Sequence, residues 1–408
     1  MIWTGILRRN KAAGAKSRSR NIFKKVLIFL GLPAVILGAL FFLSRELFYI
    51  YQNVPVRVIE PAKTLEVTEH FSGQVYFNDS LGTDDFSRLL VSNIDKAEKV
   101  IEIAMYSMDS QAIRDALYRA AGGGVAVNII FDATHQENLK KFFVAKPENV
   151  KINFVSVGEA GYMHHKFLLL DRGGAGQKLF FSSYNFTYLQ GKYDPSFILE
   201  TDRPEIIAVF GEEFDRWDVK LGSSKETAAY NPFAARIKYP EGFLEIWFSP
   251  GTVENNIKNR MIGLLRNSTG NIKAMIWQMT DRDMAAELAA AAAREPVEII
   301  TDDYNWSKDW SVFPILAAQK GRQSLDNLRL TVDQKRNQEV EKYLGNNSFN
   351  SFLHHHLLIV DDQVAVFGTE NWSSGGFFSN GESIMVTDIK SLVEAFEKSY
   401  QANYAANK

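Results

Sequence analysis

The strongest constraint on this chain is that its sequence is written twice. "QVYF" at 74–77 corresponds to "EIWF" at 245–248, and "VAVNIIFD" at 125–132 corresponds to "VEIITD" at 297–302. Between these runs, "IEIAMYSMDSQAIRDALYRAA" parallels "IKAMIWQMTDRDMAAELAAAAA", in each case a strand pattern followed by a helix pattern rich in alanine. Strands that alternate with helices predict α/β domains. We therefore expect two similar domains in tandem, each a mixed β-sheet flanked by helices.

The repeat also sets the expected domain organisation. The chain has 408 residues, which is long enough for two cores. The second copy carries an insertion of roughly twenty residues before its histidines, which we expect to form a loop or lid. The expected segments are a basic tail at 1–25, an apolar segment at 26–43, a linker at 44–69, a first domain at 70–235 and a second domain at 236–402, with the polar part of the insertion at 337–351.

Residues 26–43, "VLIFLGLPAVILGALFFL", carry no charge and predict a transmembrane anchor. As a helix, this stretch would cover about 27 Å of a bilayer core of about 30 Å. Eight basic residues in 1–25 keep the N-terminus cytoplasmic, so the domains would lie outside, on the periplasmic side of a bacterial inner membrane. A cleaved signal peptide and a buried helix are the alternatives. The length of the apolar run and its lack of a small-x-small cleavage site favour the anchor.

The charge of the chain argues against general nucleic-acid binding. The net charge is −2, but residues 26–408 hold 38 basic and 48 acidic residues, a net charge of −10. Binding to nucleic acids depends on phosphate neutralisation by Lys and Arg. The chain also has no cysteine, which excludes thiolate chemistry and cysteine metal sites. A local basic groove is compatible with these numbers.

Five of the seven histidines stand in two short runs, "HHKFLLLD" at 164–171 and "HHHLLIVD" at 354–361. Alternate residues of a strand share a face, so His164 and Lys166 point one way. By the same rule, His354 and His356 share a face. The intervening residues, His165 and His355, point to the opposite face.

The two runs predict one shared site. If the halves pack about a pseudo-twofold axis, His164 and His354 meet across the interface. One histidine would then act as a nucleophile and the other as a general acid, because the pKa of imidazole lies near working pH. Lys166, Asn185 and Asn371 would be available to hold phosphate oxygens.

The remaining histidines have a plain structural interpretation. A single strand histidine is more often a structural residue than a catalyst, and this applies to His70, His135, His165 and His355. The "HHH" run suggests a metal site, but one face of a strand offers two of the three imidazoles. We therefore expect neither a metal nor a cofactor.

The two runs resemble the phospholipase D superfamily, whose motif is H-x-K-x4-D followed by G-S/T-x-N. The resemblance covers nearly all of residues 70–390 and includes the duplication. It implies a metal-independent phosphodiesterase that acts through a phosphohistidine, with a site that forms within one chain. The matching residues are His164, Lys166, Asp171, Ser183 and Asn185 in the first copy, and His354, Asp361, Gly368, Thr369 and Asn371 in the second.

The resemblance also assigns roles. It makes His164 the nucleophile, His354 the acid that protonates the leaving group, and Glu382 the carboxylate that orients a histidine. Asp171 and Asp361 fix strand ends or turns. The residues expected to contact phosphate are Lys166, Ser183, Asn185, His356, Thr369 and Asn371.

Ser182 replaces the motif glycine of the first copy, and two further departures from the family pattern bear on the chemistry. His356 replaces the second lysine, so the phosphate pocket loses a permanent cation. An imidazolium would substitute for it and make activity more sensitive to pH. Ser196 replaces the glutamate of the first copy, unless Asp194 or Glu200 takes its place.

Three functions compete at this stage. The first is hydrolysis or headgroup transfer on phospholipids, which suits a membrane-tethered, acidic protein. The second is a metal-independent nuclease, which the charge of −10 disfavours. The third is a binding protein that has lost activity. Aromatic residues just beyond the asparagines would lie partly in the core and partly at the pocket rim, where they could insert at a lipid interface: Tyr188, Trp372, Phe377 and Phe378.

Overall fold

The structure is a computed structural model that describes residues 60–78, 85–158, 160–218, 231–306, 308–323, 327–333 and 353–407. All of these belong to one compact unit, Val58–Lys408. The predicted anchor at 26–43 and the polar stretch at 337–351 lie outside the described residues. Among the helices that are described, none is both long and apolar enough to cross a bilayer.

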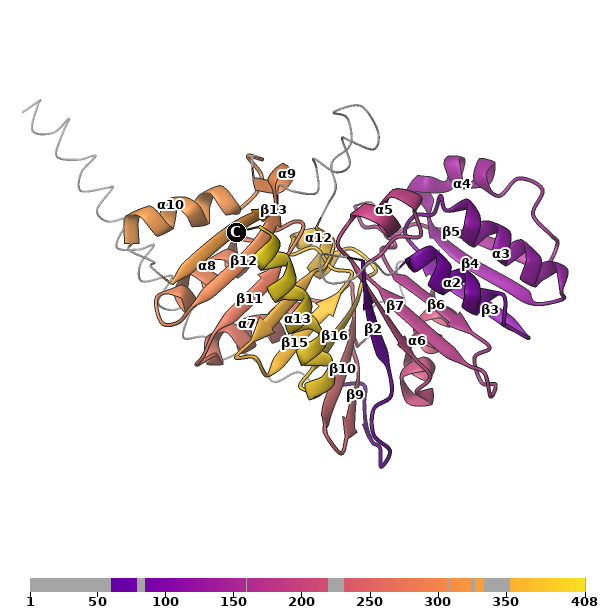
Figure 1. The fold of residues 1–408 in the computed structure, drawn as a ribbon, viewed down its shortest axis with the longest axis horizontal. Helices are drawn as coiled ribbons and strands as arrows, with labels where there is room; N and C mark the ends of the chain where they lie inside the picture. The colour runs from indigo at the N-terminus through magenta and orange to yellow at the C-terminus, as the bar shows by residue number, and fades with distance from the viewer. Residues whose placement is uncertain are drawn as a thin grey trace, which may run out of the picture. The chain divides into compact units, whose positions relative to one another are not determined.

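The first half forms a seven-stranded mixed sheet (Figure 1). Strand β3 (Val100–Met105) pairs in parallel with β4 (Ala126–Asp132), as the βα repeat predicts, and antiparallel with β6 (Lys166–Leu170) on its other side. The strands lie in the order β2 (Gln74–Phe77), β8 (Phe197–Thr201), β7 (Lys178–Ser182), β6 (Lys166–Leu170), β3 (Val100–Met105), β4 (Ala126–Asp132) and β5 (Val150–Val155).

The second half forms a nine-stranded sheet in which seven strands repeat this order. Two further strands extend one edge. The predicted tandem α/β architecture is therefore confirmed for the described residues. The order is β1 (Lys63–Glu66), β9 (Phe233–Tyr239), β10 (Gly242–Phe248), β16 (Ser383–Thr387), β15 (Val364–Gly368), β14 (Leu357–Val360), β11 (Ile272–Met275), β12 (Val297–Asp302) and β13 (Leu328–Asp333).

Strand β1 lies inside the predicted linker at 44–69. It pairs in parallel with β9, with Lys63 opposite Ala235. The sequence "KTLE" is too short and too polar to predict a strand, and it becomes one because an open sheet edge offers hydrogen bonds. Part of the expected linker is thus a strand of the second sheet, while the predicted domain bounds stay predictions.

Helices cover both faces of each sheet. On the outer faces, α2 and α3 pack on the first sheet and α7 and α8 on the second. Side-chain caps fix where these helices begin: Asp85 accepts a hydrogen bond from the Arg88 N–H (3.0 Å), and Asp281 accepts one from the Met284 N–H (2.9 Å). The helices are α2 (Phe86–Ile94), α3 (Gln111–Gly122), α4 (Gln136–Phe142), α5 (Tyr188–Tyr193), α6 (Pro204–Asp218), α7 (Ile257–Asn267), α8 (Arg282–Ala292), α9 (Asp303–Trp306), α10 (Phe313–Gln323), α12 (Ser374–Phe378) and α13 (Lys390–Ala406).

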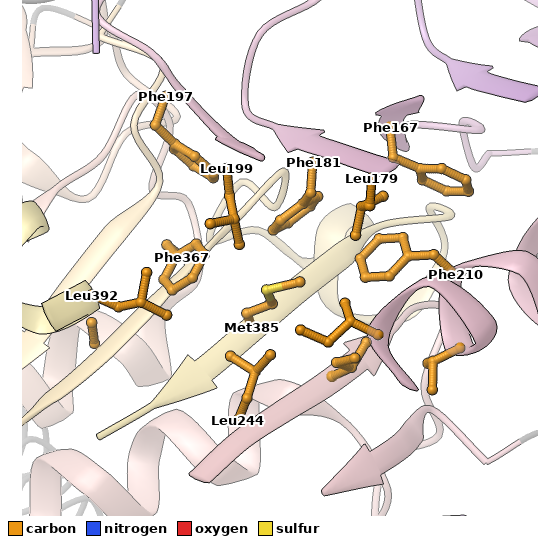
Figure 2. Close-up of a cluster of buried hydrophobic side chains, with 14 of the residues drawn as sticks. Phe167, Leu179, Phe181, Phe197, Leu199, Phe210, Leu244, Phe367, Met385 and Leu392 are labelled. Carbon is orange, nitrogen blue, oxygen red and sulfur yellow. The ribbon is translucent and has the colours of Figure 1, made fainter. Parts of the chain in front are cut away.

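The two halves share one central hydrophobic core, which includes residues of both sheets and of α6 and α13. Figure 2 shows Phe181 and Phe197 of the first half facing Phe367 of the second. The ring of Phe367 lies 5.4 Å from that of Phe197 and 6.2 Å from that of Phe181. Truncating one such buried ring to alanine costs about 3–5 kcal/mol. This core holds the two sheets against each other, and the packing determines which residues at the strand ends of the two halves can come into contact.

Candidate active site

Both histidine runs stand immediately before a central strand of their sheet. His164 precedes β6, and His354 and His356 precede β14. Strands β6 and β8 are both antiparallel to β7, so they start at the same edge of the first sheet. The same relation holds for β14 and β16 in the second sheet. The histidines and the residues before β8 and β16 therefore meet at the sheet edges.

Backbone hydrogen bonds cross between the halves at this edge. The His164 N–H donates to the Gly381 carbonyl (2.8 Å), and the His354 N–H donates to the Pro195 carbonyl (2.8 Å). Each histidine therefore pairs with the segment of the opposite half that precedes β16 or β8. Position 381 has no room for a side chain, because a Cβ there would lie 2.5 Å from the Trp217 ring. The site consequently depends on both copies.

The carboxylate of Glu382 holds the ring of His164. Its Oε2 lies 2.7 Å from His164 Nδ1 and accepts a hydrogen bond from Thr369 Oγ1 (2.6 Å), while its Oε1 accepts one from Asn380 Nδ2 (2.9 Å). Burial lowers the pKa of His164 and outweighs the opposing effect of Glu382. Because Nδ1 faces a carboxylate, the neutral ring carries its proton there. The lone pair of Nε2 is then available for attack on an electrophile.

Lys166 is fully buried beside this pair. Its Nζ donates to the His164 carbonyl (2.9 Å) and lies 5.7 Å above the ring of Tyr106. Burial lowers the pKa of Lys166 to about 7, although Glu382 opposes the shift. An anion bound next to this amine would favour its charged form, as expected for a phosphate-binding lysine.

The second histidine run faces the same cluster. Burial lowers the pKa of His354 well below 6.5, and the positive charges of Lys166 and His164 lower it further. The ring of His356 lies 5.5 Å from that of His354, and neither of its nitrogens has a hydrogen-bond partner among the described residues. His356 has a φ of 46°, in the left-handed region that histidine adopts more often than most side chains. A buried ring with both nitrogens unpaired among the described residues is compatible with the predicted phosphate contact of His356, which stays a prediction.

The two asparagines of the motifs also lack internal partners. Asn185 Oδ1 and Asn371 Oδ1 are buried, and within the described part of the chain no group hydrogen-bonds to either atom. Buried side-chain amides are normally paired, so these two await a polar ligand. A phosphate oxygen would accept from the amide nitrogen once the amide is turned.

The motif hydroxyls have framework contacts. Ser183 Oγ accepts from the Phe197 N–H (3.2 Å), and Thr369 Oγ1 donates to Glu382. Both residues are fully buried. The structure thus uses them to hold β8 and the carboxylate, and their predicted contact with phosphate stays a prediction.

The two motif aspartates occupy equivalent turns. The carboxylate of Asp171 accepts the N–H groups of Glu98, Lys99 and Val100 at 2.7–3.1 Å. Residue Asp361 has the same role in the other half, accepting the N–H groups of three consecutive residues, Thr269, Gly270 and Asn271. Both have positive φ, 48° and 57°, which aspartate tolerates better than most side chains. Their contacts are with backbone, away from the histidine rings.

Comparison with protein families shows to which family the chain belongs. The family model described as "Cardiolipin synthase, PLD-like domain" matches residues 90–217 and 261–403, one match in each half and more than half of the chain in total. The chain belongs to the phospholipase D superfamily. Within it, the matching family is one of phospholipid-modifying enzymes.

Curated relatives agree with this placement. The chain is similar to cardiolipin synthase 1 of Bacillus anthracis, with 22% identity over 358 residues, which is 79% of this chain and 65% of that protein. It is also similar to a phospholipase D of Rickettsia conorii, with 28% identity over 122 residues, or 29% of this chain and 58% of the relative. The chain spans 25% to 65% of the length of the curated relatives it matches first.

A solved structure supports the fold of this phospholipase D-like chain. The phosphatidylserine synthase of Haemophilus influenzae Rd KW20 superposes with a TM-score of 0.58 at 12% sequence identity, covering 88% of this chain and 90% of that one. Similarity at this level concerns the fold.

Two residues of this phospholipase D-like site were missed by sequence reasoning. Tyr106 meets His164 edge-on, with ring centroids 4.8 Å apart, and Trp277 lies flat on His354 at 5.1 Å. The signal was present: when "IEIAMY" is aligned with "IKAMIW", the two aromatic residues occupy the same place in the repeat. Nothing local in the sequence distinguishes an aromatic residue that lines a site from one that packs in a core.

The remaining predicted residues lie elsewhere. The His165 ring packs against Trp217 and Phe248, and its Nδ1 lies 2.6 Å from Ser383 Oγ. Glu200, an alternative partner for a histidine, accepts a hydrogen bond from Tyr76 (3.0 Å). The other histidines have separate surroundings: His355 near Phe77, His70 paired with Glu241 at the surface, and His135 edge-on to Tyr106.

The aromatic residues beyond the asparagines divide as follows. Trp372 and Phe377 are buried in the second-half core, and Phe378 packs against it. Tyr188 is 51% exposed. Among the residues described, no group of three or more His, Asp or Glu side chains is arranged to hold a metal ion.

Proposed function

We propose that this protein is a phosphodiesterase of the phospholipase D type that acts on phospholipid headgroup esters through a phosphohistidine. The observation that carries the proposal is the 2.7 Å contact between His164 Nδ1 and Glu382, which come from opposite copies, beside the buried His354. One carboxylate-held histidine next to a second histidine is what a two-step displacement at phosphorus requires.

In the first step, His164 Nε2 attacks phosphorus and the bond to the headgroup oxygen breaks. The imidazolium of His354 gives its proton to that oxygen, so the headgroup leaves as a neutral alcohol. Lys166, Asn185 and Asn371 hold the phosphate oxygens, whose charge grows in the transition state. The positive charge that develops on the phosphorylated His164 is stabilised by Glu382.

In the second step, neutral His354 accepts a proton from water or from an acceptor alcohol, whose oxygen attacks phosphorus. The bond to His164 breaks and the enzyme returns to its starting state. Water yields phosphatidic acid, and an alcohol yields an exchanged headgroup. Nothing in this sequence of steps requires a metal.

A lipid substrate is supported by the exposed side chains near the site. Six large hydrophobic residues are more than 40% exposed among the described residues, and two of them, both tyrosines, lie close in sequence to site residues. Tyr162 (43%) stands two residues before His164, and Tyr188 (51%) stands three after Asn185. Trp310 and Ile315 follow β12, whose last residue, Asp302, accepts from the Leu353 N–H. Aromatic side chains of this kind are favoured at a membrane interface.

The proposed setting is a membrane one. Residues 26–43 would anchor the protein and keep residues 58–408 beside the bilayer, on its extracytoplasmic side. Sequencing the N-terminus of the mature protein tests the anchor. A start at Met1 agrees with an uncleaved span, and a start near residue 45 contradicts it.

Product analysis tests the activity. Full-length protein is incubated in EDTA with mixed phospholipid vesicles or with DNA, and the products are separated by mass spectrometry. We expect phosphatidic acid or an exchanged headgroup, no such product with His164→Asn, and full activity with His70→Asn, a control at an exposed histidine paired with Glu241. Intact vesicles together with degraded DNA would replace the lipid proposal with a nuclease.

A further inference from the structure

His164 and His354 have equivalent backbone positions, but the residues at the corresponding place in the opposite half differ. The His164 N–H bonds to Gly381 and the His354 N–H bonds to Pro195, so Ser196 has the place relative to His354 that Glu382 has relative to His164. The Ser196 hydroxyl donates to the Asp194 carbonyl (3.0 Å). A serine supplies no negative charge to balance an imidazolium.

The aromatic neighbours of the two histidines also differ: His354 has the stacked ring, whereas His164, which has the carboxylate, meets its aromatic neighbour edge-on. The Trp277 indole lies parallel to the His354 ring, with centroids 5.1 Å apart and 18° between the planes. Its counterpart in the repeat, Tyr106, meets His164 at 68°. A parallel stack places the imidazole over the negative face of the indole, and tryptophan offers the strongest such face among the aromatic side chains.

The groups around His354 disfavour its protonated form, so any interaction that favours the imidazolium matters for its role as an acid. Lys166, His164 and His355 all act to lower its pKa, in addition to burial, and His356 lies 5.5 Å away. These neighbours disfavour the imidazolium that must protonate a leaving oxygen. The π face of an indole favours the cation without adding a charged group to a buried site.

We propose that Trp277 supports the imidazolium form of His354 through a cation–π stack, as Glu382 supports His164 through its carboxylate. The inference rests on the proposed function and deepens it, because it concerns the proton that passes from His354 to the headgroup oxygen as the phosphorus–oxygen bond breaks. Trp277 is thus a positioning residue that acts through His354. The second half of the repeat has an aromatic face where the first half has a carboxylate.

The test compares two substrates that differ in their need for a proton. The leaving group of bis(p-nitrophenyl) phosphate is a stable phenolate, whereas the alkyl headgroup of a phospholipid leaves as an alcohol and needs general acid. In full-length Trp277→Leu, we expect about a 10-fold greater loss of kcat/KM on the phospholipid than on the aryl ester, in line with the strength of desolvated cation–π pairs. Tyr106→Leu, the matched variant in the other half, should lower both rates by similar factors because it flanks the nucleophile.

A second readout does not depend on turnover. In full-length protein labelled with ¹³C-histidine, the His354 resonance is identified by its loss in His354→Gln and is titrated with and without Trp277→Leu. We expect the titration to move to lower pH in Trp277→Leu, and to move in the same direction by a smaller amount in Trp277→Phe. Adding Ser196→Glu to Trp277→Leu should restore it, because a carboxylate then stands where the first half has one.

The outcomes separate this inference from the proposed function. Equal losses on both substrates with an unmoved His354 titration would overturn the role of Trp277. A moved titration in a protein that cleaves neither substrate would preserve the stack and remove the phosphodiesterase proposal. If circular dichroism shows that Trp277→Leu is unfolded, Trp277→Phe carries the test, with a smaller downward shift expected and no shift contradicting the inference.

Discussion

The two halves of this protein share a fold but differ in the groups that surround their motif histidines. The seven repeated strands of each sheet run in the same order, and the two aspartates, Asp171 and Asp361, hold equivalent turns. At the site, however, His164 has a buried carboxylate and a lysine beside it, whereas His354 has an indole and a third histidine. The comparison shows that a duplicated scaffold can keep its frame while its two motifs specialise.

The difference has a physical logic. A nucleophile that becomes phosphorylated acquires a lasting positive charge, and a fixed carboxylate is the strongest support for it. A general acid must instead give up its proton, and a carboxylate bond would hold that proton more tightly. Ser196 and Trp277 are consistent with such a division of roles, which the following substitutions are designed to break or sharpen.

The largest effect is expected from the first histidine. His164→Asn should lower phosphodiesterase turnover by about 10⁴-fold or more, because it removes the proposed nucleophile. His354→Asn should have a smaller effect on a p-nitrophenyl ester than on a phospholipid, since the aryl group leaves without a proton. Steady-state rates on both substrates decide this. Equal losses for the two histidines on the aryl ester would contradict the assigned asymmetry.

The carboxylate comparison comes next. Glu382→Gln should cost about 10²-fold in kcat, as removal of an orienting carboxylate typically does, while Ser196→Ala should change kcat less than about 3-fold. The reason is that Glu382 contacts the ring of His164, whereas Ser196 bonds to a backbone carbonyl. The pair of rates is measured at one pH with wild-type protein as reference. A Ser196→Ala defect as large as that of Glu382→Gln would remove the distinction between the halves.

A smaller, pH-dependent effect is expected at the missing lysine. The pKa of His356 is lowered well below 6.5 by burial and by neighbouring cations, so this ring is neutral at pH 7 in the empty site and gains charge on acidification. A lysine has a much higher intrinsic pKa than a histidine, so beside a bound phosphate it keeps its charge at a pH where the imidazole is neutral. His356→Lys should therefore lower KM at pH 7 by about 3- to 10-fold, and the gain should shrink at any pH low enough to protonate the imidazole. A KM at pH 7 that the substitution leaves unchanged would argue against a phosphate-binding role for position 356.

The smallest effect concerns stability. The pKa of Lys166 is lowered from 10.5 to about 7, so between these values the unfolded chain binds a proton that the folded chain does not. Stability attributable to this residue therefore rises as pH increases from 7 to 10, and its penalty is fully present below pH 7. Lys166→Met should raise the melting temperature by about 2–6 °C at pH 7 and by less at pH 10. Calorimetry at the two pH values checks this, and an equal gain at both would mean that burial of the amine carries no titration-linked cost.

Much of the architecture could be predicted from the sequence because the repeat is long and strongly patterned. The order of strands and helices follows from runs such as "VAVNIIFD". The rings of His354 and His356 lie 5.5 Å apart, but both residues precede β14 and His356 has a φ of 46°, so strand alternation does not account for this contact. Strand β1 could not be predicted, because four residues with two charges form a strand when a neighbouring edge is available. Its identity depends on packing rather than on local propensity.

Some features of the site could likewise be predicted from the sequence, and others depend on packing. The spacing of the motifs predicted which residues approach each other, but it could not say that Glu382 bonds to the histidine of the other copy. That contact depends on how the two sheets pack across the Phe181, Phe197 and Phe367 core. For the same reason the hydroxyls of Ser183 and Thr369, expected at phosphate, are found holding the frame. Tyr106 and Trp277 were within reach of the aligned repeat, and were missed because aromatic residues are common in cores.

Direct capture of the covalent intermediate tests the central claim. Full-length protein is mixed with a slowly turning-over phosphodiester, quenched in alkali within the first turnover and digested for peptide mass spectrometry. Alkaline quenching preserves the phosphorus–nitrogen bond, which is labile in acid. The account predicts a phosphoryl adduct on the peptide that contains His164, increased in His354→Asn because an alkyl or water acceptor then lacks its base. An adduct on His354, or rapid turnover with no adduct on either histidine, would contradict it.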